Sequence, residues 1–171
     1  DMSRVYDVDP ALIGRVVAWL FAHQESNGSW KGVEGFHETS LTSQTERLPV
    51  TAYIVWGLAD AGYAADGRTQ IGASFLREHA SEAETAYELA LVANALVAVD
   101  LPTTSISAAT EAVLNRLAAM AQQEDQSAYW DAGGETYMGG YGNSARLETT
   151  AAAALAFLRS DRHVELANAA L

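Results

Sequence analysis

The chain has 171 residues, of which 49% are hydrophobic and 19% are charged. This length and composition allow one sizeable core, so we expect a single domain over residues 1–171. The formal net charge of −12 disfavours nucleic-acid binding, because that affinity depends on Lys and Arg releasing counterions from phosphates. The sequence contains no cysteine, which excludes disulfides and thiolate metal ligands.

The first predicted helix begins near Pro10, where Asp9 can cap it. Its apolar side chains recur on one stripe, so we expect that stripe to pack on the core while the opposite face meets water. The stripe contains Leu12, Val16 and Leu20, with Ile13, Val17 and Phe21 beside it. The second predicted helix begins near Pro49, and residues 50–59 are apolar on every face, which predicts burial all round.

The same two kinds of helix alternate along the rest of the chain. A one-sided helix follows the break at residues 66–67, and a second helix that is apolar all round covers residues 89–99. Residues 106–120 form another single stripe, residues 150–158 form the third apolar segment, and a further outer helix begins near Ser160. None of the apolar segments reaches the roughly 18 residues that a membrane-spanning helix needs, so we expect no membrane insertion.

This alternation predicts an all-α fold of the α/α toroid type, a partial ring of inner and outer helices. Inner helices contact both the ring axis and the outer layer, whereas outer helices meet water. The buried helices also start alike, with Thr-Ala-Tyr at residues 51–53 and 85–87 and Thr-Ala-Ala at residues 150–152, as in arrays of helix pairs. Because the sequence stops within a helical pattern, we expect a fragment of a larger protein.

The segment after the first helix carries a spaced motif, Gln24-x-x-x-Gly28-x-Trp30. Gly28 can make the turn, and the indole of Trp30 can stack on the amide of Gln24, which would tie the helix end to its neighbour. This spacing resembles the QW motif of α/α toroids. That superfamily includes terpenoid cyclases, protein prenyltransferase β subunits and the thioester domains of complement proteins and α2-macroglobulins.

Three longer segments carry a more specific resemblance. They are LPVTAYIVWGLADAGY at residues 48–63, YELALVANAL at residues 87–96 and GNSARLETTA at residues 142–151. In order and spacing they resemble the later part of the thioester domain of the bacterial α2-macroglobulin family, across nearly the whole chain. The resemblance implies a large extracellular or periplasmic parent, in some cases a membrane-anchored lipoprotein, that traps proteases after bait cleavage.

The thioester of that family forms at a Cys-x-Glu-Gln motif upstream of this region, and this chain has no cysteine. The resemblance therefore implies a non-catalytic fragment of a protease inhibitor that meets proteases through the full-length parent and needs no cofactor. Complement relatives place an acyl-accepting histidine close to the position of His37, and neutral imidazole is a competent nucleophile near pH 7. His37 is thus a candidate acyl-transfer residue, and an ordinary loop histidine is the alternative.

Other titratable residues are weaker candidates for a site. The histidines are His23, His37, His79 and His163. No two of them share a predicted helix at ligand spacing, so we expect no metal site. Glu84 and Glu148 could act as the acid and base of a glycosidase, but they lie at the starts of buried helices, where a capping role is favoured.

A long connection rich in glycine and tyrosine covers residues 123–147. Its aromatic side chains include Tyr129, Trp130, Tyr137 and Tyr141. The favoured interpretation is that they cover the end of the ring. Long ordered loops are also often functional, so contact with a partner is the alternative.

The alternative function is a toroid enzyme, either a relative of terpenoid cyclases and prenyltransferases or an (α/α)-barrel carbohydrate-active enzyme. Squalene-type cyclases use an Asp-x-Asp-Asp acid, and the nearest match is residues 7–10, where Pro10 replaces the last acid. Prenyltransferases use a zinc site that includes cysteine. Both departures favour the inhibitor over the enzyme.

Overall fold

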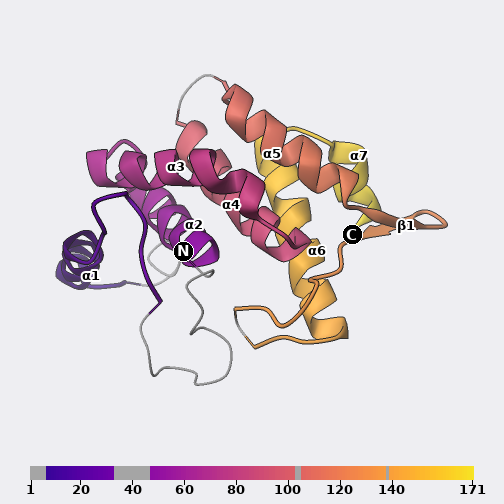
Figure 1. Ribbon diagram of the computed structural model, residues 1–171, viewed down its shortest axis with the longest axis horizontal. Helices are drawn as coiled ribbons and strands as arrows, with labels where there is room; N and C mark the ends of the chain where they lie inside the picture. The colour runs from indigo at the N-terminus through magenta and orange to yellow at the C-terminus, as the bar shows by residue number, and fades with distance from the viewer. Residues whose placement is uncertain (1–6, 33–46, 103–104, 138) are drawn as a thin grey trace.

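The computed structural model describes residues 7–32, 47–102, 105–137 and 139–171, and helices dominate them (Figure 1). The α-helices are α1 (Pro10–Ala22), α2 (Arg47–Leu58), α3 (Gly67–His79), α4 (Ala86–Asp100), α5 (Ala108–Ala119), α6 (Asn143–Ser160) and α7 (Val164–Ala169). The shorter elements are the π-helical turn η3 (Ala59–Tyr63), the 3₁₀ turn η4 (Ala80–Glu82) and the strands β1 (Gln122–Glu124) and β2 (Ser127–Tyr129). The predicted all-α fold is therefore confirmed.

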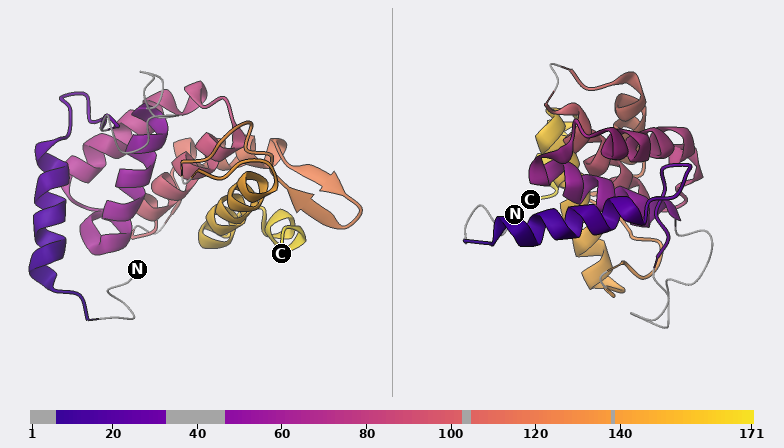
Figure 2. Two further views of the ribbon diagram at one scale, coloured as in Figure 1. Left: turned by 90° about the horizontal axis from the view of Figure 1, so that it is seen from below. Right: turned by 90° about the vertical axis from the view of Figure 1, so that its left-hand side faces the viewer.

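The helices form two layers. In the inner layer α4 packs between α2 and α6, and in the outer layer α3 packs on α2 and α4 while α5 packs on α4 and α6 (Figures 1 and 2). Inner and outer helices thus alternate along the chain, as the sequence predicts. The arrangement places the N-terminal ends of the inner helices beside the turns that follow the outer ones.

Burial differs among the three inner helices. In α4 every residue from Ala86 to Asp100 except Glu88 is buried, because α4 has an inner helix on each side. The expectation that residues 50–59 and 150–158 are also buried all round is wrong: Tyr53 of α2 and Leu155 and Leu158 of α6 are exposed. In the described part of the chain, α2 and α6 each have an inner neighbour on one side only.

Helix α1 is the least buried outer helix. Within α1, all of whose residues are described, Val17 is the only buried one. Two residues of the predicted stripe do not pack, since Leu12 and Val16 are about half exposed. The helix packs on the core through Leu20 of the stripe and through Ile13, Val17 and Phe21 beside it. The last turn of α1 is held by hydrogen bonds that its Leu20 and Phe21 carbonyls accept from the side chains of Trp30, at 2.7 Å, and Arg68, at 2.8 Å.

Side-chain caps explain where several helices begin. The Asp9 carboxylate accepts a hydrogen bond from the backbone N–H of Ala11 at 2.9 Å, as expected for the start of α1. Thr85 and Glu88 form a capping box at the start of α4. The Thr85 hydroxyl accepts a hydrogen bond from the backbone N–H of Glu88, and the Glu88 carboxylate accepts one from the backbone N–H of Thr85. This capping box fixes the residue at which α4 begins.

Asn94 joins two inner helices. Its amide nitrogen donates to the carbonyl of Ala90 in α4 at 2.9 Å and to the carbonyl of Ala152 in α6 at 2.8 Å. The one polar side chain in the apolar run of α4 thus bonds to neighbouring backbone. Buried amides need such partners, because an unpaired polar group in a core is costly.

A short hairpin formed by β1 and β2 was not predicted. The strands are antiparallel, with Gln122 opposite Tyr129, and the hairpin projects from the side of the molecule (Figure 2). Asp125 in the turn has a positive φ of 54°. Strands of three residues, mostly exposed, leave no alternation long enough to detect.

Candidate functional site

The motif Gln24, Gly28 and Trp30 forms a latch between an outer and an inner helix. Trp30 is 2% exposed, its indole N–H donates to the carbonyl of Leu20 in α1 at 2.7 Å, and its backbone N–H donates to the hydroxyl of Thr51 in α2 at 3.0 Å. One tryptophan thus ties the end of α1 to the start of α2. We call this arrangement the first latch.

The glutamine and glycine of the motif shape the turn before Trp30. The Gln24 amide donates to the carbonyls of Gly28, at 3.0 Å, and Arg68, at 2.9 Å, while its stacking on the indole of Trp30 stays a prediction. Gly28 has a φ of 90°, and a Cβ there would lie 2.6 Å from the backbone oxygen of Ile71. Only glycine allows this close approach to α3.

Trp130 forms a second latch with the same geometry. It is completely buried, its indole N–H donates to the carbonyl of Leu117 in α5 at 2.8 Å, and its backbone N–H donates to the hydroxyl of Thr150 in α6 at 3.1 Å. Trp130 therefore belongs to the core and not to the surface considered for partner contact. Sequence reasoning missed this role, although a Trp about 20 residues before a Thr-Ala pair is a shared signal. The expectation that these pairs open the helices holds for Thr85, the N-cap of α4, but is wrong for Thr51 and Thr150, since α2 begins at Arg47 and α6 at Asn143.

The connection between Trp130 and α6 is held by a network centred on Glu148. The Glu148 carboxylate accepts hydrogen bonds from the Tyr87 phenol at 3.0 Å and from the Thr136 hydroxyl at 2.6 Å. The backbone N–H of Tyr137 donates to the Tyr87 oxygen at 3.1 Å, and that of Gly140 donates to the Thr136 hydroxyl at 2.9 Å. We call residues 131–137 and 139–142 the anchored loop.

Tyr87 is chemically suited to this anchoring role. Burial is the main cause that raises the pKa of its phenol well above the usual value, and the nearby Glu148 carboxylate adds to the rise. The phenol therefore stays protonated and can donate to Glu148 while its oxygen accepts from Tyr137. The expected capping role of Glu84 and Glu148 is wrong: Thr85 and Glu88 cap α4, and Glu148 lies within α6, where it anchors the loop. Glu84 is exposed at the turn before α4.

The tyrosines of this region differ in exposure. Tyr141 is 77% exposed, whereas Tyr137 is half-buried and stacks on Tyr53 with 5.9 Å between ring centroids. Tyr129 is half-buried under the guanidinium of Arg146, which lies 4.7 Å from the ring centroid. These three tyrosines therefore reach the surface, and Tyr141 presents most of its ring there.

The histidines that the structure describes lie apart. His23 stacks on Trp19, His79 bonds to Glu82 and His163 bonds to Asn115. Within residues 7–32, 47–102, 105–137 and 139–171, no group of three or more His, Asp or Glu residues could hold a metal ion. His37 lies outside the described residues, so its acyl-transfer role stays a prediction.

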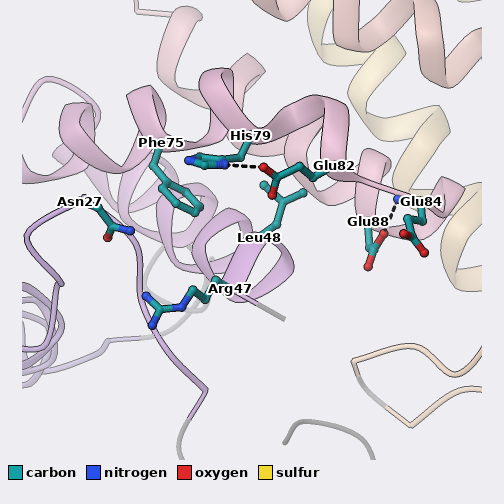
Figure 3. Close-up of a pocket in the computed structure, with 8 residues that line it drawn as sticks. All are labelled: Asn27, Arg47, Leu48, Phe75, His79, Glu82, Glu84 and Glu88. Atoms are coloured by element: carbon teal, nitrogen blue, oxygen red, sulfur yellow. Dashed lines mark hydrogen bonds and ion pairs between the residues drawn. The ribbon is translucent and has the colours of Figure 1, made fainter. Parts of the chain in front are cut away.

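A cavity of about 520 Å³ lies between the start of α2, the end of α3 and the start of α4 (Figure 3). It is lined by Asn27, Arg47, Leu48, Phe75, His79, Glu82, Glu84 and Glu88. The ring of Phe75 lies beside that of His79, and the imidazole Nδ1 is 2.8 Å from the Glu82 carboxylate. These residues come from four separate parts of the chain, so no local sequence pattern identifies the cavity.

The two latches, the anchored loop and the alternating helices define a two-layer α/α domain built from repeated helix pairs. A family model described as the A-macroglobulin TED domain matches residues 1–171. The chain therefore belongs to the A-macroglobulin TED domain family. No curated protein matches it. In the described part of the chain, none of the helices has the length and apolar character needed to cross a membrane.

Proposed function

We propose that this chain is a non-catalytic structural and interaction domain of a bacterial α2-macroglobulin-like protease inhibitor. The observation that carries the proposal is the match of the TED domain model to all 171 residues. The alternating helices and the two latches support it, because they tie outer helices to inner ones as a structural scaffold requires. The proposed partners are proteases, bound by the full-length parent.

The chemistry available to the chain supports an interaction role. The chain has no cysteine, so it cannot itself form a thioester with a Cys-x-Glu-Gln motif. The thioester of any covalent capture by the parent would therefore lie outside these residues. The domain would then orient the captured protease, and no cofactor is needed for that task.

The anchored loop is the proposed contact surface for a partner. Glu148 and Tyr87 hold the loop in place, and Tyr141 projects from it with 77% of its surface exposed. Exposed tyrosines on a fixed, glycine-rich loop are typical of protein-binding surfaces, because they offer contact area at low entropic cost. Tyr129 and Tyr137 flank this surface.

The proposed location is extracellular or periplasmic, with a membrane-anchored lipoprotein as one form of the parent. Members of the family are generally secreted. The formal net charge of −12 supports a partner other than nucleic acid.

A toroid enzyme has less support. The glycosidase alternative requires Glu148 to act as an acid or base, but both carboxylate oxygens of Glu148 accept hydrogen bonds that hold the anchored loop. A carboxylate engaged in this way is better suited to fixing structure than to exchanging protons with a substrate. The inhibitor is therefore the function we propose.

The test is a protease-capture assay with the full-length gene product. After incubation with an endopeptidase, we expect hydrolysis of a large protein substrate to fall while hydrolysis of a small peptide substrate continues. If the parent carries a Cys-x-Glu-Gln motif, methylamine treatment should also abolish covalent capture. Unchanged hydrolysis of the protein substrate by several endopeptidases would overturn the proposal.

A further inference from the structure

We propose that the cavity beside α4 binds a lysine or arginine side chain of a protein partner. The inference deepens the proposed function and rests on it in one respect, namely that the partner is a protein. Three features favour a cationic side chain as the ligand: the apolar floor of the cavity, its acidic rim and the proposed protein-contact loop beside it.

The floor of the cavity suits the aliphatic part of a long side chain. Leu48 and Phe75 are both buried, and both line the cavity. Lys and Arg place their methylene groups on apolar surface while the charged head stays at the polar rim. A cavity of about 520 Å³ has room for one such side chain together with its neighbours in a peptide.

The rim of the cavity is acidic, and its one arginine is already paired. Arg47 donates to the carboxylate of Glu25, which also pairs with Lys31 at 3.0 Å, and, at 3.2 Å, to the hydroxyl of Ser29. Glu82 is bonded to the imidazole of His79, so Glu82, Glu84 and Glu88 place three carboxylates on the rim beside one arginine and one histidine. Among the described residues, no cation pairs with the exposed carboxylate of Glu84. The rim therefore retains uncompensated negative charge, which attracts cations and repels anions.

One carboxylate at the rim is also fixed in position. An oxygen of Glu88 accepts the backbone N–H groups of Glu84, at 2.8 Å, and Thr85, at 3.2 Å. Figure 3 shows Glu84 and Glu88 side by side at the end of the cavity nearest α4. A carboxylate held by its own backbone loses little freedom when it meets a cation, so binding costs less entropy.

The anchored loop borders this acidic end, which points to a protein as the source of the cation. A Cβ on Gly133 would lie 2.8 Å from the Thr85 side chain, so the loop touches the residue between the two glutamates. A free amine would use the cavity alone. A protein segment can place its Lys or Arg in the cavity and its neighbours on the loop around Tyr141.

The experiment measures binding of a hexalysine peptide to the 171-residue chain by calorimetry at low and physiological ionic strength. We expect E82Q/E84Q to weaken binding about tenfold, which corresponds to loss of one well-placed charge pair. The control E124Q/E165Q removes the same charge from exposed sites on β1 and α7 and should change affinity less than about twofold. A hexaglutamate peptide should not bind.

Equal weakening by the two double variants would show attraction to net charge alone and would overturn the cavity proposal, as would an absence of hexalysine binding. Melting curves of both variants check that the fold is kept.

Comparison of Tyr141→Ala with the wild type tests the loop. A two- to threefold loss of affinity for hexalysine is expected, because contact area is lost. If the parent inhibits proteases but E82Q/E84Q binds hexalysine as the wild type does, only this inference fails. If the cavity binds hexalysine but the parent does not inhibit proteases, only the proposed function fails.

Discussion

The first and second latches reach the same geometry from different turns. In both, a buried tryptophan donates its indole N–H to the end of an outer helix and its backbone N–H to a threonine of the next inner helix. Leu20 lies 10 residues before Trp30, whereas Leu117 lies 13 residues before Trp130. The extra length accommodates the hairpin of β1 and β2, so the Trp–Thr pair is the constant part and the turn is variable.

The two latches also differ in the segments that support them. The connection after Trp130 returns to α6 through the anchored loop, whose hydrogen bonds reach Tyr87 in the central helix. The turn before Trp30 depends instead on the amide of Gln24 and the positive φ of Gly28. A recognisable motif therefore marks only one of two equivalent structural units.

The largest expected effect is the loss of either tryptophan. Trp130→Ala and Trp30→Ala should each lower the free energy of unfolding by about 3–5 kcal/mol, because each removes a large buried side chain and leaves a cavity. Urea denaturation measures both values. Trp19→Ala, at a tryptophan that is 50% exposed, is the matched control and should cost far less. A small loss for Trp130→Ala alone would show that the two latches are not equivalent.

The next effect isolates the hydrogen bond in each latch. Thr51→Val and Thr150→Val keep the side-chain shape but remove the acceptor for a buried tryptophan N–H, so each should cost about 1–3 kcal/mol. The serine variants Thr51→Ser and Thr150→Ser retain the hydroxyl and should recover most of the loss. If serine and valine behave alike, the bond contributes little and packing alone holds the latch.

A smaller effect separates the anchored loop from the second latch. Tyr87→Phe removes the hydroxyl that bonds Glu148 and Tyr137, so the loop should exchange its amide hydrogens faster, at a stability cost of about 1–2 kcal/mol. Hydrogen exchange followed by mass spectrometry reports on residues 131–142. Protection at Trp130 should stay unchanged. Equal loss of protection at both places would mean that loop and latch open together.

The smallest expected effect lies at the opposite end of α4, away from the latches. Burial raises the pKa of the Asp100 carboxyl, but hydrogen bonds from Thr110 and Ser107 and the charge of Arg77 more than offset it, so the pKa lies below its usual value. A carboxyl with a lowered pKa stabilises the fold above its unfolded pKa of about 4, and the stability is lost as pH falls through the folded value.

Asp100→Asn removes that titration. We therefore expect the variant to be less stable than the wild type at neutral pH and to lose less stability between neutral pH and the acidic range. Thermal melts at a series of pH values measure the two slopes. Parallel slopes for variant and wild type would rule out a contribution of Asp100 to the acid sensitivity.

Much of the fold can be predicted from the sequence because the pattern of apolar residues along each helix indicates which of its faces are buried. The run at residues 89–99 is apolar on all faces, and α4 is indeed buried on all sides. The sequence also predicts the turn at Gly28, since a positive φ favours glycine. Local patterns of this kind identify the alternating helices and the family.

Other features depend on residues that are distant in the sequence. Tyr87 and Glu148 are 61 positions apart, and Trp130 has no glutamine–glycine motif to reveal its latch. The incomplete burial of α2 and α6 depends on which helices lie beside them, which no residue of either helix specifies. The sequence determines which surfaces need to be buried, whereas only the tertiary structure decides which neighbours bury them, because packing brings together groups from separate helices.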